Sequence, residues 1–160
     1  MEPGETPPEC AVREILEETG LKAELVCPPA TWLASRDLSL APFPWEGQGI
    51  PPLLVLPRDS SPEGPVNLMY LARATGHPRP CAEIRGLLLL RPEDVLRICR
   101  EQLPYADYLT TGGAAVVRAP YPPSMALDPG PQVKLLARLL PAPGALPLLH
   151  SVPGPGESAE

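Results

Sequence analysis

The pattern of apolar and polar residues near the start of the chain predicts a helix. Its apolar stripe, at the three- and four-residue spacing of a buried helical face, consists of Ala11, Val12, Ile15 and Leu16. Thr6 is the expected N-cap, Pro7 takes the first helical position, and Glu9 completes a capping box. Gly20 follows the last periodic residue and supplies a left-handed stop. A helix is therefore expected between Thr6 and Gly20.

Short apolar runs further along the chain predict the strands of a sheet. They cover residues 21–27, 31–35, 53–56, 66–74, 86–90 and 114–118. The run over residues 66–74 is the strongest of them, and its mixed apolar character predicts a central strand. Residues 38–52 are rich in proline and glycine and are expected to form a loop. Two more helices are expected, over residues 92–102 and 131–140.

Composition indicates one folded domain with proline-rich loops. A chain of 160 residues is long enough for a single core, and its 44% of hydrophobic residues is close to the globular average. The 26 prolines and 13 glycines gather in a few stretches, the last of which closes the chain. We expect a folded domain over residues 1–140 and a disordered tail over residues 141–160.

Charge and hydropathy argue against two classes of partner. The formal net charge of −6 disfavours duplex nucleic acid, whose phosphates require a basic face. A membrane span is not expected, because the sequence holds no run of about 18 apolar residues. The acidic N-terminus lacks the basic and apolar parts of a signal peptide, so the expected compartment is the cytosol.

The polar side of the first predicted helix is acidic. At about 100° per residue, Glu14, Glu17 and Glu18 fall within one arc of about 100°. Like charges at this spacing repel, and Arg13 offsets part of the repulsion by pairing with Glu17 or Glu9. A hard divalent cation held by the carboxylates would explain the arc. A solvated helix face is the alternative.

The same segment resembles the signature of the Nudix hydrolases, Gly-x5-Glu-x7-Arg-Glu-U-x-Glu-Glu-x-Gly-U, in which U is aliphatic. Eight of the nine fixed positions are present at the correct spacing: Glu5, Arg13, Glu14, Ile15, Glu17, Glu18, Gly20 and Leu21. The resemblance implies an α/β fold with a mixed sheet packed between helices. The leading glycine would precede Met1, so we expect a domain that is incomplete at its N-terminus and lacks the family's first strands.

The resemblance also implies a reaction and a set of site residues. The expected activity is hydrolysis of a nucleoside diphosphate linked to another moiety X, with water attacking phosphorus and Mg²⁺ (or Mn²⁺) as the cofactor. Glu14, Glu17 and Glu18 would bind the metal, and Arg13 would orient them. Glu83 matches an accessory glutamate that precedes a late strand in many relatives. Either Glu14 or Glu83 would serve as the general base.

Other functions stay open at this point. The intact carboxylate set favours an enzyme, whereas the short N-terminus favours a catalytically inactive Nudix-like binding module or a truncated remnant. An acidic helical interaction protein is a third interpretation. The substrate is expected to be a small nucleotide, with oxidised nucleotides, nucleotide sugars, ADP-ribose and dinucleotides as the candidates.

Overall fold

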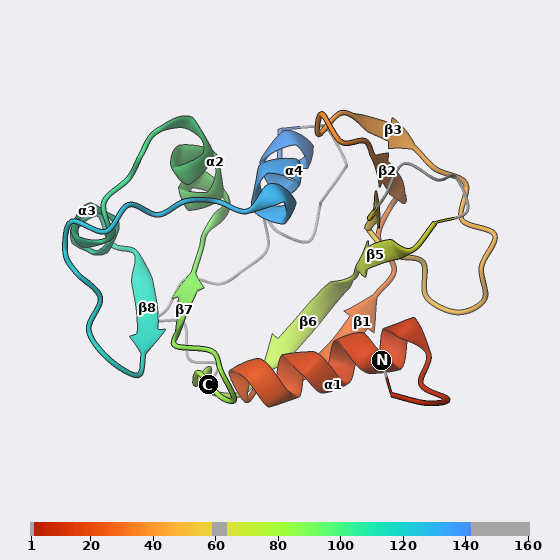
Figure 1. The fold of residues 1–160 in the computed structure, drawn as a ribbon, viewed down its shortest axis with the longest axis horizontal. Coiled ribbons are helices and arrows are strands. Elements are labelled where there is room, and N and C mark those ends of the chain that lie inside the picture. The colour runs from red at the N-terminus through yellow and green to blue at the C-terminus, as the bar shows by residue number, and fades with distance from the viewer. Residues whose placement is uncertain (1, 59–63, 142–160) are drawn as a thin grey trace, which may run out of the picture.

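A computed structural model describes residues 2–58 and 64–141 of the chain (Figure 1). The helices are α1 (Pro7–Thr19), α2 (Pro92–Arg100), α3 (Tyr105–Thr110) and α4 (Pro131–Leu139). The strands are β1 (Lys22–Val26), β2 (Trp32–Ala34), β3 (Leu40–Pro42), β4 (Leu54–Pro57), β5 (Val66–Met69), β6 (Leu71–Thr75), β7 (Gly86–Leu89) and β8 (Ala114–Val117). The predicted tail lies outside the described residues from position 142 onward, and the predicted domain boundary stays a prediction.

The ends of α1 form as its sequence predicts. The carboxylate of Glu9 accepts hydrogen bonds from the Thr6 backbone N–H at 2.9 Å and from the Thr6 hydroxyl at 2.6 Å. At the other end, Gly20 adopts a φ of 69° and donates its N–H to the Leu16 carbonyl at 2.9 Å. A left-handed residue of this kind is the common way to end a helix, and glycine adopts it without strain.

The strands confirm the expected α/β fold with a mixed sheet, and they are distributed over three sheets. One sheet has the order β3-β2-β4-β5, with β2 parallel to β4 and the other pairs antiparallel. The antiparallel pairs β1–β6 and β7–β8 make up the other two. Strands β5 and β6 are separated by Tyr70 alone, so one nearly continuous run joins two sheets (Figure 1).

Two predictions about individual elements were wrong, and one helix was not predicted. The run over residues 66–74 is not a central strand, because it changes partner at Tyr70: β5 pairs with β4, and β6 pairs with β1. Residues 38–52 contain the short strand β3, whose Pro42 is tolerated because β3 lies at the edge of its sheet. The six-residue helix α3 was missed, since it is too short to show an apolar period.

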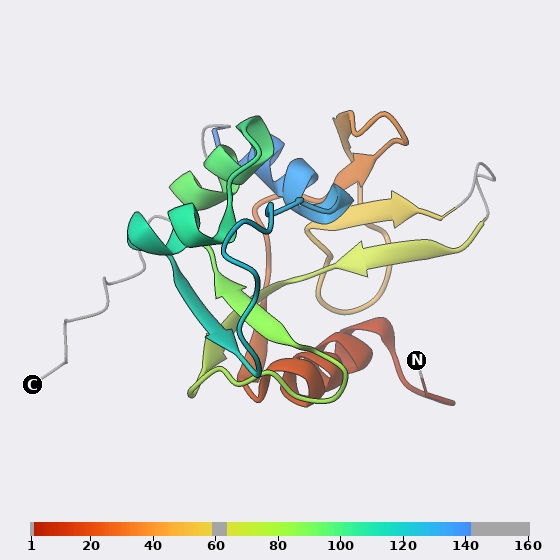
Figure 2. The same ribbon diagram turned by 60° about the vertical axis from the view of Figure 1, so that its left-hand side comes forward.

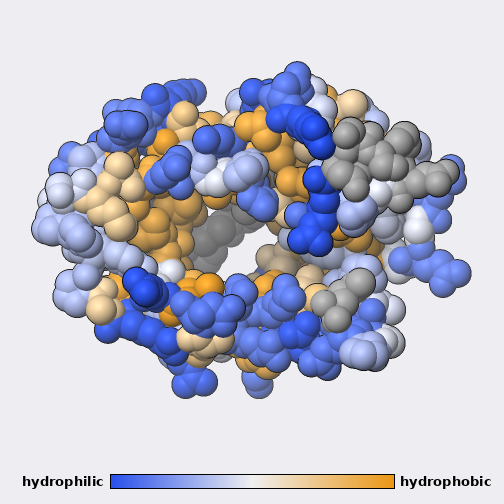
Figure 3. All heavy atoms as spheres, in the orientation of Figure 1, coloured by the Kyte–Doolittle hydropathy of each residue, from blue (hydrophilic) through white to orange (hydrophobic). Residues whose placement is uncertain are grey.

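Two apolar clusters form the core of the described residues. In the first, β2 and β4 pack against α2 and α4, with Leu54 and Leu135 fully buried. The second joins α2 and α3 and includes the fully buried Tyr108. Within the described part of the chain, α1, β1 and β6 contribute no residue to either cluster. Figure 3 shows a hollow between α1 and the pair α2 and α4, and α1 packs mainly on β1.

No helix among the described residues is both long enough and apolar enough to span a bilayer.

Candidate active site

Helix α1 presents its acidic residues to solvent near its C-terminal end. Glu14, Glu17 and Glu18 are all exposed, and the last turn of the helix contains no basic residue. The C-terminal end of a helix carries partial negative charge from its unpaired carbonyl groups, which disfavours nearby carboxylates. The arc therefore combines mutual repulsion with an unfavourable helix dipole, and a bound cation would relieve both.

Arg13 is the centre of an ion-pair network on α1. Its guanidinium makes two contacts with the carboxylate of Glu5, Nε to Oε1 at 2.7 Å and Nη2 to Oε2 at 3.1 Å. The Nη1 atom donates to Glu17 at 2.7 Å, and Glu14 lies 3.7 Å from Nη2. Arg13 therefore links the segment before the helix to two carboxylates of the arc.

Glu5 is held more tightly than the carboxylates of the arc. Its side chain is 11% exposed and also accepts a hydrogen bond from the backbone N–H of Glu2 at 2.9 Å. The hydrogen bonds from Arg13, followed by the one from Glu2, lower the pKa of Glu5 from 4.5 to about 2. Glu5 thus stays ionised and anchors the start of α1, which makes it an unsuitable proton acceptor at neutral pH.

Glu14 has a second neighbour in Cys10, the buried cysteine of α1. The thiol of Cys10 donates to Oε1 of Glu14 at 3.3 Å. Burial, and then the neighbouring Glu14, raise the pKa of Cys10, so the thiol remains protonated and available as a donor. This contact orients Glu14, which the family resemblance implies as a metal ligand and, as an alternative to Glu83, as the general base.

The loop before β7 lies against the C-terminal end of α1 (Figure 2). The backbone N–H of Arg79 donates to the Thr19 carbonyl, and that of Cys81 donates to the Glu18 carbonyl, each at 2.8 Å. These contacts satisfy two of the carbonyl groups that a helix leaves unpaired at its end. Exposed Glu83 follows Cys81 by two residues on this loop.

Arg118, directly after β8, holds this loop in place. Its Nε donates to the Pro80 carbonyl at 3.1 Å, its Nη1 donates to the Ala82 carbonyl at 2.6 Å, and its backbone N–H donates to the Arg85 carbonyl at 2.9 Å. Ala82 has a φ of 47°, a left-handed conformation that costs a non-glycine residue energy. No sequence motif marks Arg118, because its partners lie more than 30 residues away in the chain.

The donor atoms of α1 suit a hard divalent cation, because carboxylate oxygens are the ligands that Mg²⁺ prefers. In residues 2–58 and 64–141, however, no three acidic, histidine or cysteine side chains lie close enough together to hold a metal ion. Glu17 is engaged by Arg13, so binding requires the carboxylates to turn toward a shared centre. The roles of Glu14, Glu17 and Glu18 as ligands, of Glu14 or Glu83 as the base and of Arg13 in orienting the site stay predictions.

The comparisons with known proteins agree with the motif on α1. A family model described as the NUDIX domain matches residues 1–108 of the 160-residue chain. No solved structure matches the chain. The matched segment includes α1, the loop that contacts it, and Glu83. Since the match covers more than half of the chain, the protein belongs to the NUDIX family.

Proposed function

We propose that this protein is a Mg²⁺-dependent hydrolase of a nucleoside diphosphate linked to a second moiety X. The observation that carries the proposal is the exposed carboxylate arc of α1, in a family segment where the loop of Glu83 is hydrogen-bonded to the same end of the helix. An arc of this kind is electrostatically unfavourable without a cation. A pyrophosphate substrate brings further negative charge, which increases the need for one.

The residues of the site have distinct proposed roles. Glu14, Glu17 and Glu18 hold the cation, which supplies the positive charge that the pyrophosphate oxygens require. Arg13 holds the carboxylates of Glu14 and Glu17 near its guanidinium through contacts at 3.7 and 2.7 Å. Either Glu14 or Glu83 accepts the proton of the attacking water at a carboxylate oxygen. The Cys10 thiol limits the rotation of Glu14 by donating to its Oε1 atom.

A second candidate function is nucleotide binding without turnover. It is favoured by the absence of three gathered metal-binding side chains in the described part of the chain, and by the ion pair that engages Glu17. It is also consistent with the position of α1 outside the two apolar clusters of those residues. A module of this kind would bind the substrate class without a bound metal and release it unchanged.

The test compares turnover by the protein and by Glu17→Gln. Phosphate release is measured from a panel of nucleoside diphosphate derivatives, with and without Mg²⁺, in the presence of an added pyrophosphatase or phosphatase. We expect Mg²⁺-dependent turnover of at least one compound, and loss of that turnover in Glu17→Gln. Glu24→Gln, which neutralises an exposed carboxylate of β1, is the matched control and should keep full activity.

Two outcomes would contradict the proposal. Full activity in Glu17→Gln would remove Glu17 from the metal site. No turnover of any compound by a folded protein, combined with calorimetric binding of one of them in EDTA, would favour the binding module. Circular dichroism and thermal unfolding establish that each variant is folded, so that loss of activity is not a loss of structure.

A further inference from the structure

Arg79 lies over the C-terminal end of α1. A Cβ atom on Gly20, the glycine that ends this helix, would come within 2.7 Å of Cγ and 2.9 Å of Nε of Arg79. The backbone N–H of Arg79 also donates to the Thr19 carbonyl at 2.8 Å. Glu17 and Glu18 precede Gly20 by three and two residues, so Arg79 contacts α1 within one helical turn of these carboxylates of the arc.

The side chain of Arg79 has no polar partner among residues 2–58 and 64–141. It takes part in no ion pair there, and the hydrogen bonds that Arg79 makes are those of its backbone. Arg13 of α1, in contrast, is paired with two carboxylates, and Arg118 donates to two backbone carbonyls of the loop. Since Arg79 is also exposed, the donors of its guanidinium are open to a ligand.

The backbone at Arg79 is restricted on both sides. Pro78 precedes it and Pro80 follows it, and a proline disfavours the helical region for the residue before it. The Thr19 carbonyl holds the N–H of Arg79, and part of the side chain packs on Gly20, which has no side chain of its own. Less conformational freedom is therefore lost when the guanidinium meets a ligand, and such preorganisation favours binding.

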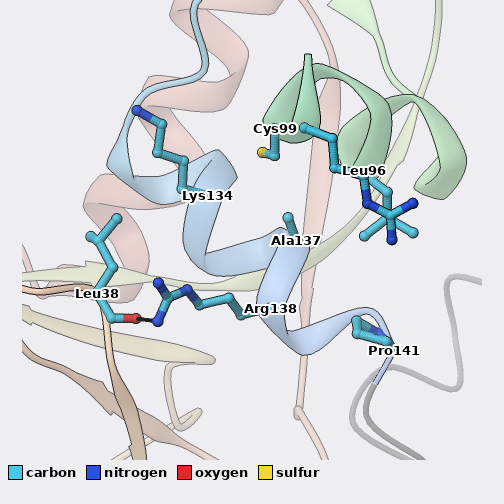
Figure 4. Close-up of a pocket in the computed structure, with 8 residues that line it drawn as sticks. Leu38, Leu96, Cys99, Lys134, Ala137, Arg138 and Pro141 are labelled. Carbon is cyan, nitrogen blue, oxygen red and sulfur yellow. Dashed lines mark hydrogen bonds between the residues drawn. The ribbon is translucent and has the colours of Figure 1, made fainter.

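The cations of α4 are arranged differently. The charged ends of Lys134 and Arg138 point away from each other, and the Arg138 guanidinium donates to the Leu38 carbonyl at 2.7 Å (Figure 4). These two side chains do not meet at one centre. Arg79, in contrast, lies beside a site for which an anionic substrate is already proposed.

We propose that Arg79 binds one phosphoryl group of the pyrophosphate substrate, next to the phosphoryl group at the carboxylate arc. This assignment rests on the function proposed above for the α1 site. The two phosphoryl groups of a pyrophosphate share one bridging oxygen atom, so a ligand with one group at the arc keeps the other within reach of a neighbouring side chain. A guanidinium suits that second group because its paired N–H donors match phosphate oxygen atoms.

Stabilisation of α1 is the competing explanation for Arg79. The C-terminal end of the helix carries partial negative charge, and its last turn contains no basic residue, so a guanidinium there stabilises the helix. This effect needs no ligand and is measured by the unfolding midpoint. Ligand affinity of the folded protein separates the two explanations.

Isothermal titration calorimetry measures binding of methylenediphosphonate, a pyrophosphate analogue that resists hydrolysis, to the full chain in the presence of Mg²⁺. Arg79→Gln should weaken this binding about tenfold or more, because the lost contacts are charge-assisted hydrogen bonds. Methylphosphonate, which has a single phosphonate group, should lose much less affinity. Arg79→Lys keeps the charge without the paired donors and should give an intermediate affinity. The matched control is Arg73→Gln, which removes an exposed arginine of β6 and should bind as the parent does.

Three results would overturn the role of Arg79: parental affinity in Arg79→Gln, equal weakening in Arg73→Gln, or no binding by the folded parent. A lower unfolding midpoint with parental affinity would assign Arg79 to helix stability alone. Turnover distinguishes these failures from failure of the proposed hydrolase. An active parent whose KM is unchanged by Arg79→Gln would contradict the role of Arg79 alone, whereas a raised KM with a similar kcat would support it. Binding that depends on Arg79, without turnover of any compound, would support this role and contradict the hydrolase.

Discussion

Arg118 provides a direct test of how the site is assembled, since it holds the loop of Glu83 against α1. In Arg118→Ala the hydrogen bonds to the carbonyls of Pro80 and Ala82, at 3.1 and 2.6 Å, are lost. The backbone of the loop is unchanged by this substitution, and so are its own contacts with α1. The variant therefore tests whether the contacts with α1 hold the loop in place without the side chain of Arg118.

The expected effect follows from the strength of the two lost bonds. Ala82 is exposed, so water can form hydrogen bonds with the carbonyl groups that the guanidinium no longer contacts. The net contribution of each lost hydrogen bond to stability is therefore about 0.5–1.5 kcal/mol. The conformation in which the loop is held is therefore destabilised by about 1–3 kcal/mol relative to open conformations. The ratio of held to open molecules falls roughly 5–150-fold. The left-handed backbone of Ala82, at φ 47°, adds to the tendency to open because opening relieves it.

Amide hydrogen exchange measures this opening without any assumption about activity. The N–H groups of Arg79 and Cys81, which donate to carbonyls of α1 at 2.8 Å, should exchange about 5–150-fold faster in Arg118→Ala. An amide of fully buried Leu135 should exchange at the parent rate. Arg85→Ala removes a neighbouring exposed guanidinium and is the matched control. Unchanged exchange at Cys81 in Arg118→Ala would refute the reasoning.

If the proposed activity is found, the same variant tests Glu83 as well. Arg118→Ala should then lower turnover by a factor similar to the fall in the population of the held loop conformation. Glu83→Gln should have little further effect in that background if Arg118 acts through Glu83, because the two changes would remove the same contribution. Fully additive losses would show that Arg118 and Glu83 act independently.

Two further predictions concern stability. A side chain on Gly113 would overlap the ring of Tyr108, whose hydroxyl donates to Leu89 O at 2.9 Å and accepts from Ala114 N at 3.1 Å. Gly113→Ala should lower the free energy of unfolding by about 2–4 kcal/mol and the melting temperature by roughly 5–15 °C, measured by scanning calorimetry. Gly130→Ala is the control, because Gly130 has space for a methyl group, and it should change the melting temperature little. For Glu5, a pKa lowered from 4.5 to about 2 means that its contribution to stability is complete above pH 4.5 and is lost as pH falls toward 2. Urea unfolding over this range should show a smaller loss of stability on acidification in Glu5→Gln, and an unchanged pH dependence would contradict the role of the Arg13–Glu5 pair.

The sequence was most informative where contacts are local. The helix α1 was predicted from Thr6, Glu9 and Gly20, since caps act over three or four residues and depend on few residue types. The pairing of Arg13 with Glu17, four residues on, follows from helical geometry in the same way. Its bidentate contact with Glu5 required the segment before the helix to fold back on it, and helical periodicity does not describe that.

Contacts between residues far apart in the chain could not be predicted from the sequence. The apolar run over residues 66–74 has the pattern of one buried strand. Such a pattern does not show how many strands pair with the run, or at which residue the pairing strand changes. Arg118 is a similar case: its partners Pro80 and Ala82 lie 38 and 36 residues earlier in the chain. Hydrogen bonds to backbone carbonyls select no residue type in the partner, so they leave no trace in a sequence motif.

The structure also explains why polar contacts have particular importance around this site. Among the described residues, the buried side chain of α1 is that of Cys10, and the helix adds nothing to the two apolar clusters. Its attachment to the rest of the chain therefore depends on β1 and on the Arg79 and Cys81 hydrogen bonds at its end. Such contacts are weaker than a packed core. A cation on the arc would stabilise the same helix whose carboxylates bind it, so that metal binding and the local order of α1 are thermodynamically linked.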